Sequence, residues 1–387
     1  MPRTTVEQTG PSIVSVETRL VDLPFIRLQR FARLDAFQQT SLFVRITDTE
    51  GRVGVGEAIV PCGPWWSGDS VESMKATIDT YLAPAMAGQG VTDQDALFAE
   101  LNLVARGNRF AKAALEIACM DLLGRQLGVP VHVLLGGRRC EACLVAWPLA
   151  SGDPAKDREE IEHMLETGKA GAFKVKAGAD QLDFDLKRIE GLVDACAGRA
   201  GIRVDPNESW SEVHSLSALP ELKAMGVELV EQPVPREHTG AMARITARSP
   251  LPIMVDEGQC TETDMLDVVS QEAAHIVSLK VMKSGGIRAT RRVADIAHAG
   301  GMPLYMGTFL ETGIGTAAGM HLAASLPSLP FGGELFAPLL LKDDLLTEPL
   351  RYENGRLHLP DGAGLGVEVD DNKLEHFTRD GSHVVTR

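Results

Sequence analysis

Long apolar segments are absent from this chain. No apolar run approaches the roughly 18 residues that a transmembrane helix requires. The N-terminal segment MPRTTVEQTG also lacks the hydrophobic stretch of a secretory signal. We therefore expect a protein that works in the cytoplasm and has no membrane partner.

Cysteine and aromatic residues are both scarce. The 387 residues include six cysteines, which we expect to be reduced thiols inside a cell. Cys140 and Cys143 form a CxxC pair, but no second CxxC or CxxH accompanies it, so a zinc site is not expected. Aromatic residues make up 5% of the chain, which argues against a surface that stacks nucleobases.

Positive charge is in deficit as well. The chain has 38 lysines and arginines against 53 aspartates and glutamates, for a formal net charge of −15. A chain of that sign is a poor ligand for nucleic acid or an anionic membrane, so we expect a small-molecule partner. The hydrophobic fraction of 44% is typical of a globular protein.

The N-terminal third of the sequence indicates an α+β domain. Residues 12–60 contain apolar segments typical of strands, and Asp48-Thr49-Glu50-Gly51 interrupts them as a β-hairpin turn would. Residues 70–128 then carry apolar side chains at helical spacing. Strands followed by helices, without alternation, favour a separate domain, which we assign to residues 1–137.

From residue 143 onward, short apolar segments alternate with amphipathic ones. We predict eight strands at 144–148, 173–176, 202–205, 228–231, 253–256, 276–280, 303–306 and 331–335. The strand ends from Lys176 to Lys280 lie 29, 26, 25 and 24 residues apart, which is enough for one helix and two turns. Such units predict an α/β fold, a (β/α)8-type barrel over residues 138–345. We expect residues 346–387 to pack back on the N-terminal domain.

Three consecutive strands of the predicted barrel end in a carboxylate. These residues are Asp205, Glu231 and Asp256, and the C-terminal ends of parallel barrel strands face one mouth. Three anions brought that close require a cation among them. Carboxylate oxygens, without histidine or cysteine, favour Mg²⁺ or Mn²⁺ over zinc.

Lysines end other strands of the predicted barrel. Lys174 and Lys176 are two residues apart, so their side chains lie on one side of a strand. Lys280 comes four strands later, on the opposite side of the barrel. A substrate in the mouth would lie between ammonium groups, and a neighbouring cation favours the neutral lysine that general acid/base chemistry needs.

Five segments around these residues resemble the enolase superfamily: FKVKAG, RVDPNESW, VEQPV, MVDEG and LKVMKSGGI. A lysine on each face, Lys176 and Lys280, is similar to the muconate-lactonizing subgroup. The seventh strand runs into LYMGT, without the histidine of the mandelate racemase subgroup. Four further stretches, VAWPLASGD, GNRFAKAALE, GTFLETGIGT and GELFAPLLL, resemble the muconate cycloisomerases. The likeness covers essentially the whole chain and implies an N-terminal α+β capping domain in front of the barrel.

The resemblance implies a role for each candidate residue. It implies four catalytic residues: Lys174, Lys176, Lys280 and Glu334. It implies a metal site of Asp205, Glu231 and Asp256, supported from outside by Asn207. It implies substrate contacts from Lys174, Arg27, Trp65, Trp66, Thr308 and Phe336. Within this set Lys176 would be the acid/base, and Lys174 would tune it and contact a substrate carboxylate.

The activity implied by the resemblance is a metal-dependent cycloisomerase that interconverts cis,cis-muconate and muconolactone through an enolate, in aromatic catabolism. Two alternatives within the subgroup stay open. One is chloromuconate cycloisomerization, and the other is racemization of an N-acylamino acid or epimerization of a dipeptide, which two opposed lysines permit. An aldolase barrel is disfavoured by the capping domain and the KxK pair, and a purely binding barrel by the complete set of acids and lysines. The resemblance also implies a homo-oligomer, the octamer being common in the family.

Two segments of the capping domain are predicted to close over the barrel, at about residues 24–37 and 61–70. The first contains three arginines suited to a substrate with two carboxylates: Arg27, Arg30 and Arg33. The second contains Trp65 and Trp66, which either narrow the pocket or pack the lid on the barrel.

A glycine pair follows Lys280 in the sequence. Gly285 and Gly286 open the next predicted helix, and a helix N-terminus of this kind can bind phosphate. A tight turn between strand and helix is the interpretation that we favour. A nucleotide site is not expected at GTFLETGIGT, which lacks the lysine of a phosphate loop.

Overall fold

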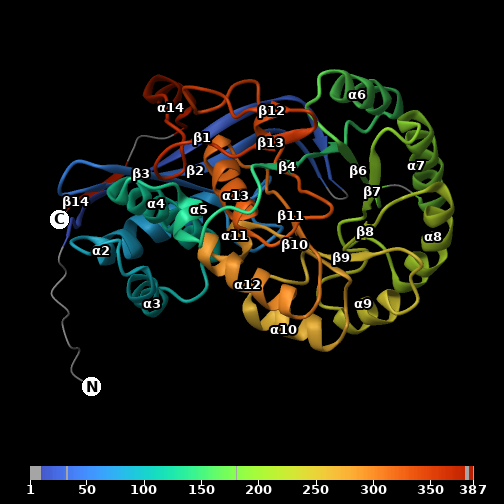
Figure 1. Ribbon diagram of the computed structural model, residues 1–387, viewed down its shortest axis with the longest axis horizontal. Coiled ribbons are helices and arrows are strands. Elements are labelled where there is room, and N and C mark those ends of the chain that lie inside the picture. The colour runs from blue at the N-terminus through green and yellow to red at the C-terminus, as the bar shows by residue number, and fades with distance from the viewer. Residues whose placement is uncertain (1–9, 32–33, 180, 380–382, 387) are drawn as a thin grey trace.

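The computed structural model describes residues 10–31, 34–179, 181–379 and 383–386, so Arg33 lies outside the described residues. An antiparallel sheet with its helices and a curled parallel sheet ringed by helices lie next to each other (Figure 1). Among the described residues, none of the helices is both long and apolar enough to cross a membrane.

The antiparallel sheet has the order β14-β1-β2-β3. Its strands are β1 (Ile13–Arg30), β2 (Asp35–Asp48), β3 (Val53–Ile59) and β14 (His383–Thr386). The predicted hairpin is confirmed, since β2 pairs antiparallel with β3. Its turn forms because Asp48 Oδ1 accepts the backbone N–H groups of Glu50 and Arg52, each at 2.9 Å, while Gly51 adopts a positive φ of 75°.

Helices cover one face of this sheet. They are α1 (Val71–Thr77), η1 (Ile78–Leu82), α2 (Ala83–Met86), α3 (Gln94–Val104), α4 (Arg109–Leu127) and α5 (Val131–Leu134). The long helix α4 lies directly on β3, where a Cβ at Gly56 would stand 2.1 Å from the carbonyl oxygen of Ala114. Glycine is therefore required there for the helix to approach the strand so closely.

In the part of the chain that the structure describes, the barrel sheet contains seven parallel strands in chain order. They are β5 (Ala146–Leu149), β6 (Ala172–Lys176), β7 (Gly201–Asp205), β8 (Val230–Glu231), β9 (Ile253–Val255), β10 (Ile276–Leu279) and β11 (Leu304–Met306). The helices around it are α6 (Pro154–Glu166), α7 (Leu182–Cys196), α8 (Glu212–Met225), α9 (Thr239–Thr246), α10 (Glu262–Ser270), α11 (Val281–Ser284), α12 (Ile287–Ala299) and α13 (Gly313–Ser325). This is the predicted α/β barrel, with β–α units that bring the C-terminal strand ends to one mouth.

The predicted eighth strand at 331–335 is wrong as an extended element. In its place, Gly333 alone forms parallel bridges to Val145 and to Met306, which close the ring between the first and seventh strands. A Cβ at Gly333 would lie 2.6 Å from the Cβ of Met306, and one at Gly332 would lie 2.4 Å from the carbonyl oxygen of Leu144. The space between the first and seventh strands is too narrow here for side chains. The backbone therefore passes between them at Gly332 and Gly333 and does not form an extended strand.

The C-terminal part of the chain contacts both sheets. β12 (Tyr352–Glu353) and β13 (Arg356–His358) form a small antiparallel sheet with β4 (Ala142–Leu144) at the base of the barrel. The remaining elements are η2 (Ala337–Leu339) and α14 (Asp371–Phe377), and β14 then pairs with β1. We propose the division into residues 1–137, 138–345 and 346–387 as the domain organisation.

Candidate active site

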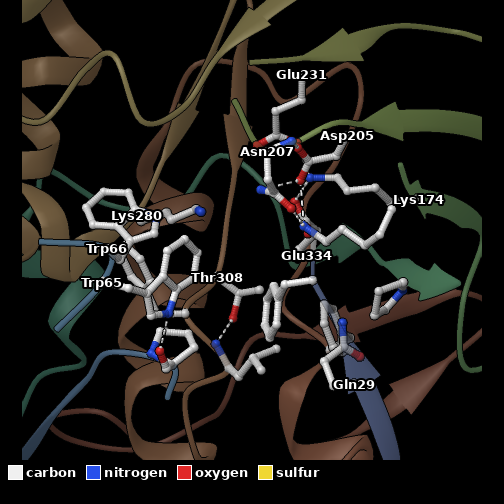
Figure 2. Close-up of a pocket in the computed structure, with 17 residues that line it drawn as sticks. Gln29, Trp65, Trp66, Lys174, Asp205, Asn207, Glu231, Lys280, Thr308 and Glu334 are labelled. Carbon is white, nitrogen blue, oxygen red and sulfur yellow. Dashed lines mark hydrogen bonds and ion pairs between the residues drawn. The ribbon is translucent and has the colours of Figure 1, made fainter. Parts of the chain in front are cut away.

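A narrow cavity lies at the mouth of the barrel, beneath the capping domain (Figure 2). It is lined by Gln29, Phe31, Pro61, Trp65, Trp66, Pro148, Lys174, Lys176, Asp205, Asn207, Glu231, Lys280, Thr308, Phe309, Leu310, Glu334 and Phe336. Its free volume is about 30 Å³, room for only one or two water molecules. A ten-atom dicarboxylate therefore enters only when side chains of the lid or the mouth move apart.

Lys174, near the end of β6, is one of several fully buried charged groups in the mouth. Its side chain is 1% exposed and its ammonium group pairs with the carboxylates of Glu231 and Glu334. Burial alone would lower the pKa of Lys174, but attraction by Glu231 and Glu334 outweighs it and holds the pKa well above its usual value. Lys174 is therefore a permanent cation, whose direct effect is to neutralise two neighbouring acids.

Lys176 lies on the same side of β6, as the spacing of two predicts, and its side chain is more accessible, at 12%. Its Nζ donates to Asp205 Oδ2 at 2.5 Å and to Asn207 Oδ1 at 3.1 Å. The ring of Phe31, from the lid, lies 5.7 Å from Nζ. Lys176 thus presents its ammonium group at the edge of the cavity, next to one of the three strand-end acids.

Lys280 faces Lys174 from across the cavity, as expected for a residue four strands away (Figure 2). It follows β10 and pairs with Asp256 Oδ2, while its Nζ lies 4.7 Å from the centroid of the Phe309 ring. Burial would lower the pKa of Lys280, yet attraction by Asp256 and then Glu231 raises it above its usual range. The mouth therefore carries cations on two opposed walls.

The three strand-end acids differ in their electrostatic surroundings. Burial favours the neutral form of each, but Lys176 and Lys174 outweigh burial at Asp205 and lower its pKa. Lys280 does the same for Asp256, whose pKa is held well below its usual value. Burial dominates at Glu231 and raises its pKa to about 8, with repulsion from Asp205 opposing the attraction of Lys174. Of the three acids, Glu231 is therefore the one whose negative charge the neighbouring lysines compensate least.

The acids suit a hard divalent cation, although they currently face lysines. Within the described ranges, no group of three histidine, cysteine, aspartate or glutamate side chains is in position to hold a metal ion. The donor set is nevertheless all carboxylate, and Glu231 Oε1 is buried without a hydrogen-bond partner among the described residues. A divalent cation would satisfy this unpartnered oxygen and would favour the charged form of Glu231, so the residues fit such an ion.

Asn207 and a fourth acid adjoin the carboxylates. Asn207 donates its side-chain N–H to Asp205 Oδ2 at 3.1 Å and to Glu257 Oε1 at 3.2 Å. Burial, followed by repulsion from Asp256 and Asp205, raises the pKa of Glu257 well above its usual value. Sequence reasoning missed Glu257, although it stands next to Asp256 in the segment MVDEG.

Lys283 is a second residue that sequence reasoning missed. It is fully buried on α11, and its Nζ donates to Asp256 Oδ1 at 2.9 Å and to the Asp256 carbonyl at 2.7 Å. The signal was present in LKVMKSGG, where a second lysine stands one helical turn beyond Lys280. Asp256 is thus oriented by two lysines.

The two lid tryptophans occupy different environments. Trp65 lines the cavity, donates its indole N–H to the Pro61 carbonyl at 2.6 Å, and lies 6.2 Å from the ring of Phe31. Trp66 is 5% exposed and packs edge-on against Phe309 at 4.6 Å. Both tryptophans thus line the cavity, and Trp66 in addition packs the lid on the barrel.

The remaining predicted substrate contacts divide into two groups. Thr308 and Phe336 line the cavity, as does Gln29, which sequence reasoning did not single out. Arg27 does not line it. Its guanidinium donates to Glu160 and to the Pro148 carbonyl, at 3.0 and 2.9 Å. The arginine faces the outside of the first barrel unit, since Glu160 on α6 neutralises it there.

The chain matches two models of protein families. Residues 14–136 match the N-terminal domain of the mandelate racemase / muconate lactonizing enzyme family, and residues 156–373 match the enolase C-terminal domain-like family. Together these matches cover most of the chain.

Curated relatives and solved structures resemble the whole chain. It is 50% identical to the chloromuconate cycloisomerase of Cupriavidus pinatubonensis over 368 residues, 95% of this chain and 99% of the relative. It is 40% identical to muconate cycloisomerase 1 of Pseudomonas putida over 96% of this chain and all of that protein. The structure of the Pseudomonas fluorescens muconate lactonizing enzyme with muconolactone superposes with a TM-score of 0.94, at 41% identity, over 96% of this chain and 100% of that chain.

Proposed function

The chain belongs to the mandelate racemase / muconate lactonizing enzyme family of the enolase superfamily, and we propose that its barrel mouth cycloisomerizes cis,cis-muconate to muconolactone. It is an isomerase of the intramolecular lyase type, as the cycloisomerases that it resembles along its whole length are. The observation that carries the proposal is the placement of Lys176 and Lys280 on opposed walls of one cavity that also holds three strand-end carboxylates.

The reaction requires one bond between oxygen and carbon and one transferred proton. A carboxylate oxygen of muconate adds to the double bond at the far end of the chain, and the electron pair moves toward the other carboxylate, giving an enolate. Lys176 Nζ donates its proton to the α-carbon of that enolate, which leaves a neutral amine and muconolactone. In the reverse direction the amine removes the same proton. Lys280 supplies positive charge from the opposite wall, and Lys174 keeps Glu231 and Glu334 neutralised.

Enzymes of this family are metal-dependent, and we propose Mg²⁺ or Mn²⁺ as the ion for this chain. Asp205, Glu231 and Asp256 would hold it, and Asn207 would orient Asp205 through the hydrogen bond that it donates to the Asp205 carboxylate. When bound, a divalent cation supplies positive charge where negative charge develops in the reaction. Asp205 and Asp256 would exchange their present lysine partners for it, which frees Lys176 and Lys280 to face the substrate.

Two alternative activities differ in what they predict. Chloromuconate as the substrate is supported by the relative at 50% identity. Racemization of an N-acylamino acid, or epimerization of a dipeptide, would use Lys176 and Lys280 as bases on two faces. Our proposal keeps cis,cis-muconate, and neither alternative, as the principal substrate.

An absorbance assay tests the proposal directly. The chain is incubated with cis,cis-muconate, 3-chloromuconate and N-succinylamino acids in turn, with Mn²⁺ and again after EDTA. We expect loss of the muconate signal with Mn²⁺ and no loss after EDTA. No consumption of cis,cis-muconate would overturn the proposal. Consumption of 3-chloromuconate alone would establish the chloromuconate enzyme instead, and exchange of the α-proton of an N-succinylamino acid with D₂O would establish the racemase.

We further propose a homo-oligomer in the cytoplasm. All six cysteines are free thiols, which supports a reducing compartment. The family resemblance supports the oligomer, and light scattering on the purified chain measures its mass against the 41.6 kDa of one subunit.

A further inference from the structure

A second cavity lies between the capping domain and the barrel, away from the active site. Its volume is about 330 Å³, which suffices for a small ligand. One wall comes from α3 and α4, and the other from the start of α10, the end of α11 and the first turns of α12. Among the described residues, none that lines this cavity also lines the active site.

Each acid on the cavity wall already has a partner. Asp95 pairs with Arg288, and Glu262 pairs with Arg292 at 2.6 Å. The carboxylate of Glu116 accepts the first two backbone N–H groups of α12, at 2.7 and 2.9 Å. The helix N-terminus that follows the glycine pair is therefore capped by the protein itself, which rules out the phosphate site considered there from sequence.

Two cations on the same wall remain without an acid partner. Among the described residues, neither Arg109 nor Lys112 forms an ion pair, and they stand one turn apart on α4. Lys112 is 5% exposed, and its Nζ donates only to neutral oxygens, those of Asn102 and Ala105, both at 2.6 Å. Arg109 donates Nε to the carbonyl of Lys283 at 2.8 Å. Burial, with repulsion from Arg109, lowers the pKa of Lys112, as expected for an ammonium group that lacks a counter-ion.

Ser284 provides a third, independent observation. It lies on the barrel side of the same cavity, is 8% exposed, and its hydroxyl has no hydrogen-bond partner among the described residues. Buried hydroxyls are normally hydrogen-bonded, so this group has an unused donor beside two cations that form no ion pair among the described residues.

From this cavity, its two unpaired cations and its unpartnered hydroxyl, we propose that the protein binds a small dianion, of the phosphate or dicarboxylate class, between the capping domain and the barrel. Arg109 and Lys112 supply the positive charge, and Ser284 donates a hydrogen bond from the other wall. The site is distinct from the barrel mouth, and its ligand contacts both the capping domain and the barrel.

Isothermal titration at low ionic strength tests the site, with the Mg²⁺-loaded full chain and two probes, inorganic phosphate and succinate. Low salt is needed because screening weakens charge recognition. We expect Lys112→Gln to weaken binding of the better probe by about tenfold or more. The matched control Lys187→Gln, an exposed lysine on α7, should leave the affinity within about twofold, which is the noise of such a charge deletion far from the site.

Ser284→Ala keeps the proposal falsifiable if Lys112→Gln folds poorly, because it removes only a hydroxyl. We expect it to weaken binding by about 3- to 10-fold. The better probe distinguishes the two chemical classes, phosphate or dicarboxylate. Unchanged affinity in both variants, binding of neither probe, or ligand density in soaked crystals at the barrel mouth alone would each overturn the proposal. A lower melting temperature with unchanged affinity would make Lys112 a cap for the end of α3 only.

Discussion

The barrel mouth and the lid above it are held together by different forces. In the mouth, Lys174, Lys176 and Lys280 each pair with a carboxylate that closes another strand. The lid contacts the barrel over the cavity through aromatic rings, with Trp66 edge-on to Phe309 at 4.6 Å, and outside the cavity Arg27 pairs with Glu160.

This difference suggests that the mouth carries out the reaction, whereas the lid determines which substrate fits. The barrel backbone fixes which charged residues stand at the strand ends, so the same groups face the mouth whichever ligand is bound. The aromatic contacts of the lid depend on side-chain packing, which adapts to volume. We therefore expect changes in the mouth to abolish turnover and changes in the lid to alter which substrate is preferred.

The largest effect is expected from Lys176→Ala. The variant lacks the group that exchanges a proton with the α-carbon, so kcat should fall by about 10⁴-fold. Mn²⁺ binding, measured by calorimetry, should persist because Asp205, Glu231 and Asp256 are untouched. Lactonization at close to the wild-type rate would refute the assignment of Lys176. Lys187→Ala, on the exposed face of α7, serves as the control.

Removal of the metal by EDTA should also stop turnover, by about 10³-fold, without unfolding the chain. The reason is that lysines neutralise the acids when no cation is present, as the pairs of Asp205 with Lys176 and Asp256 with Lys280 illustrate. Activity and circular dichroism are recorded together during EDTA titration and after Mg²⁺ is restored. Simultaneous loss of activity and of the circular dichroism signal would mean that the metal stabilises the fold. The charges of the mouth would then not be held in place by the barrel alone, and the contrast with the lid would fail.

The same contrast decides what could be predicted from sequence. Strand-end residues such as Asp205 and Lys280 were placed correctly because barrel topology converts sequence position into position around the mouth. Arg27 was expected in the cavity, but it faces Glu160, since the direction of a side chain on a long lid strand depends on its neighbours. The buried Glu57 of β3 was missed for the same reason, since two of its three hydrogen-bond partners, Thr312 and Gly315, lie more than 250 residues away in the sequence.

A smaller, substrate-dependent effect is expected from Trp65→Ala. The ring lines the cavity and contacts Phe31, and such aromatic contacts contribute ~0.5–1.5 kcal/mol. We expect kcat/KM for muconate to fall by about 2- to 10-fold, mainly through KM.

The ratio of 3-chloromuconate to muconate turnover should rise in Trp65→Ala, because the cavity widens on its apolar side. Trp65→Phe, which keeps a ring, is the matched control. Its ratio of 3-chloromuconate to muconate turnover should lie between the ratios of wild type and Trp65→Ala. A pure loss of kcat with both substrates would place Trp65 with the catalytic residues and would erase the contrast with the mouth.

The smallest effect on activity, and a clear one on stability, is expected at the seam between capping domain and barrel. Glu57 of β3 is fully buried there, and burial raises its pKa from 4.5 to about 7 despite hydrogen bonds from Ser41, Gly315 and Thr312. A raised folded-state pKa means that the native chain holds the proton more tightly than the unfolded chain. The stabilisation is therefore complete below about pH 4.5 and is lost as the pH rises through about 7, a change of ~3 kcal/mol.

Glu57→Gln should remove that pH dependence while keeping the seam intact. An amide oxygen at Oε1 still accepts from Thr312 and Gly315, and the Ser41 hydroxyl can accept from the new N–H₂ group at the other position. Urea unfolding from pH 4.5 to 8 should give a flatter stability curve for Glu57→Gln than for wild type, whereas Glu348→Gln, at an exposed position, should follow wild type. Parallel curves for Glu57→Gln and wild type would mean that Glu57 is ionised throughout. The seam would then be an electrostatic contact like the mouth, and no longer a packed one like the lid.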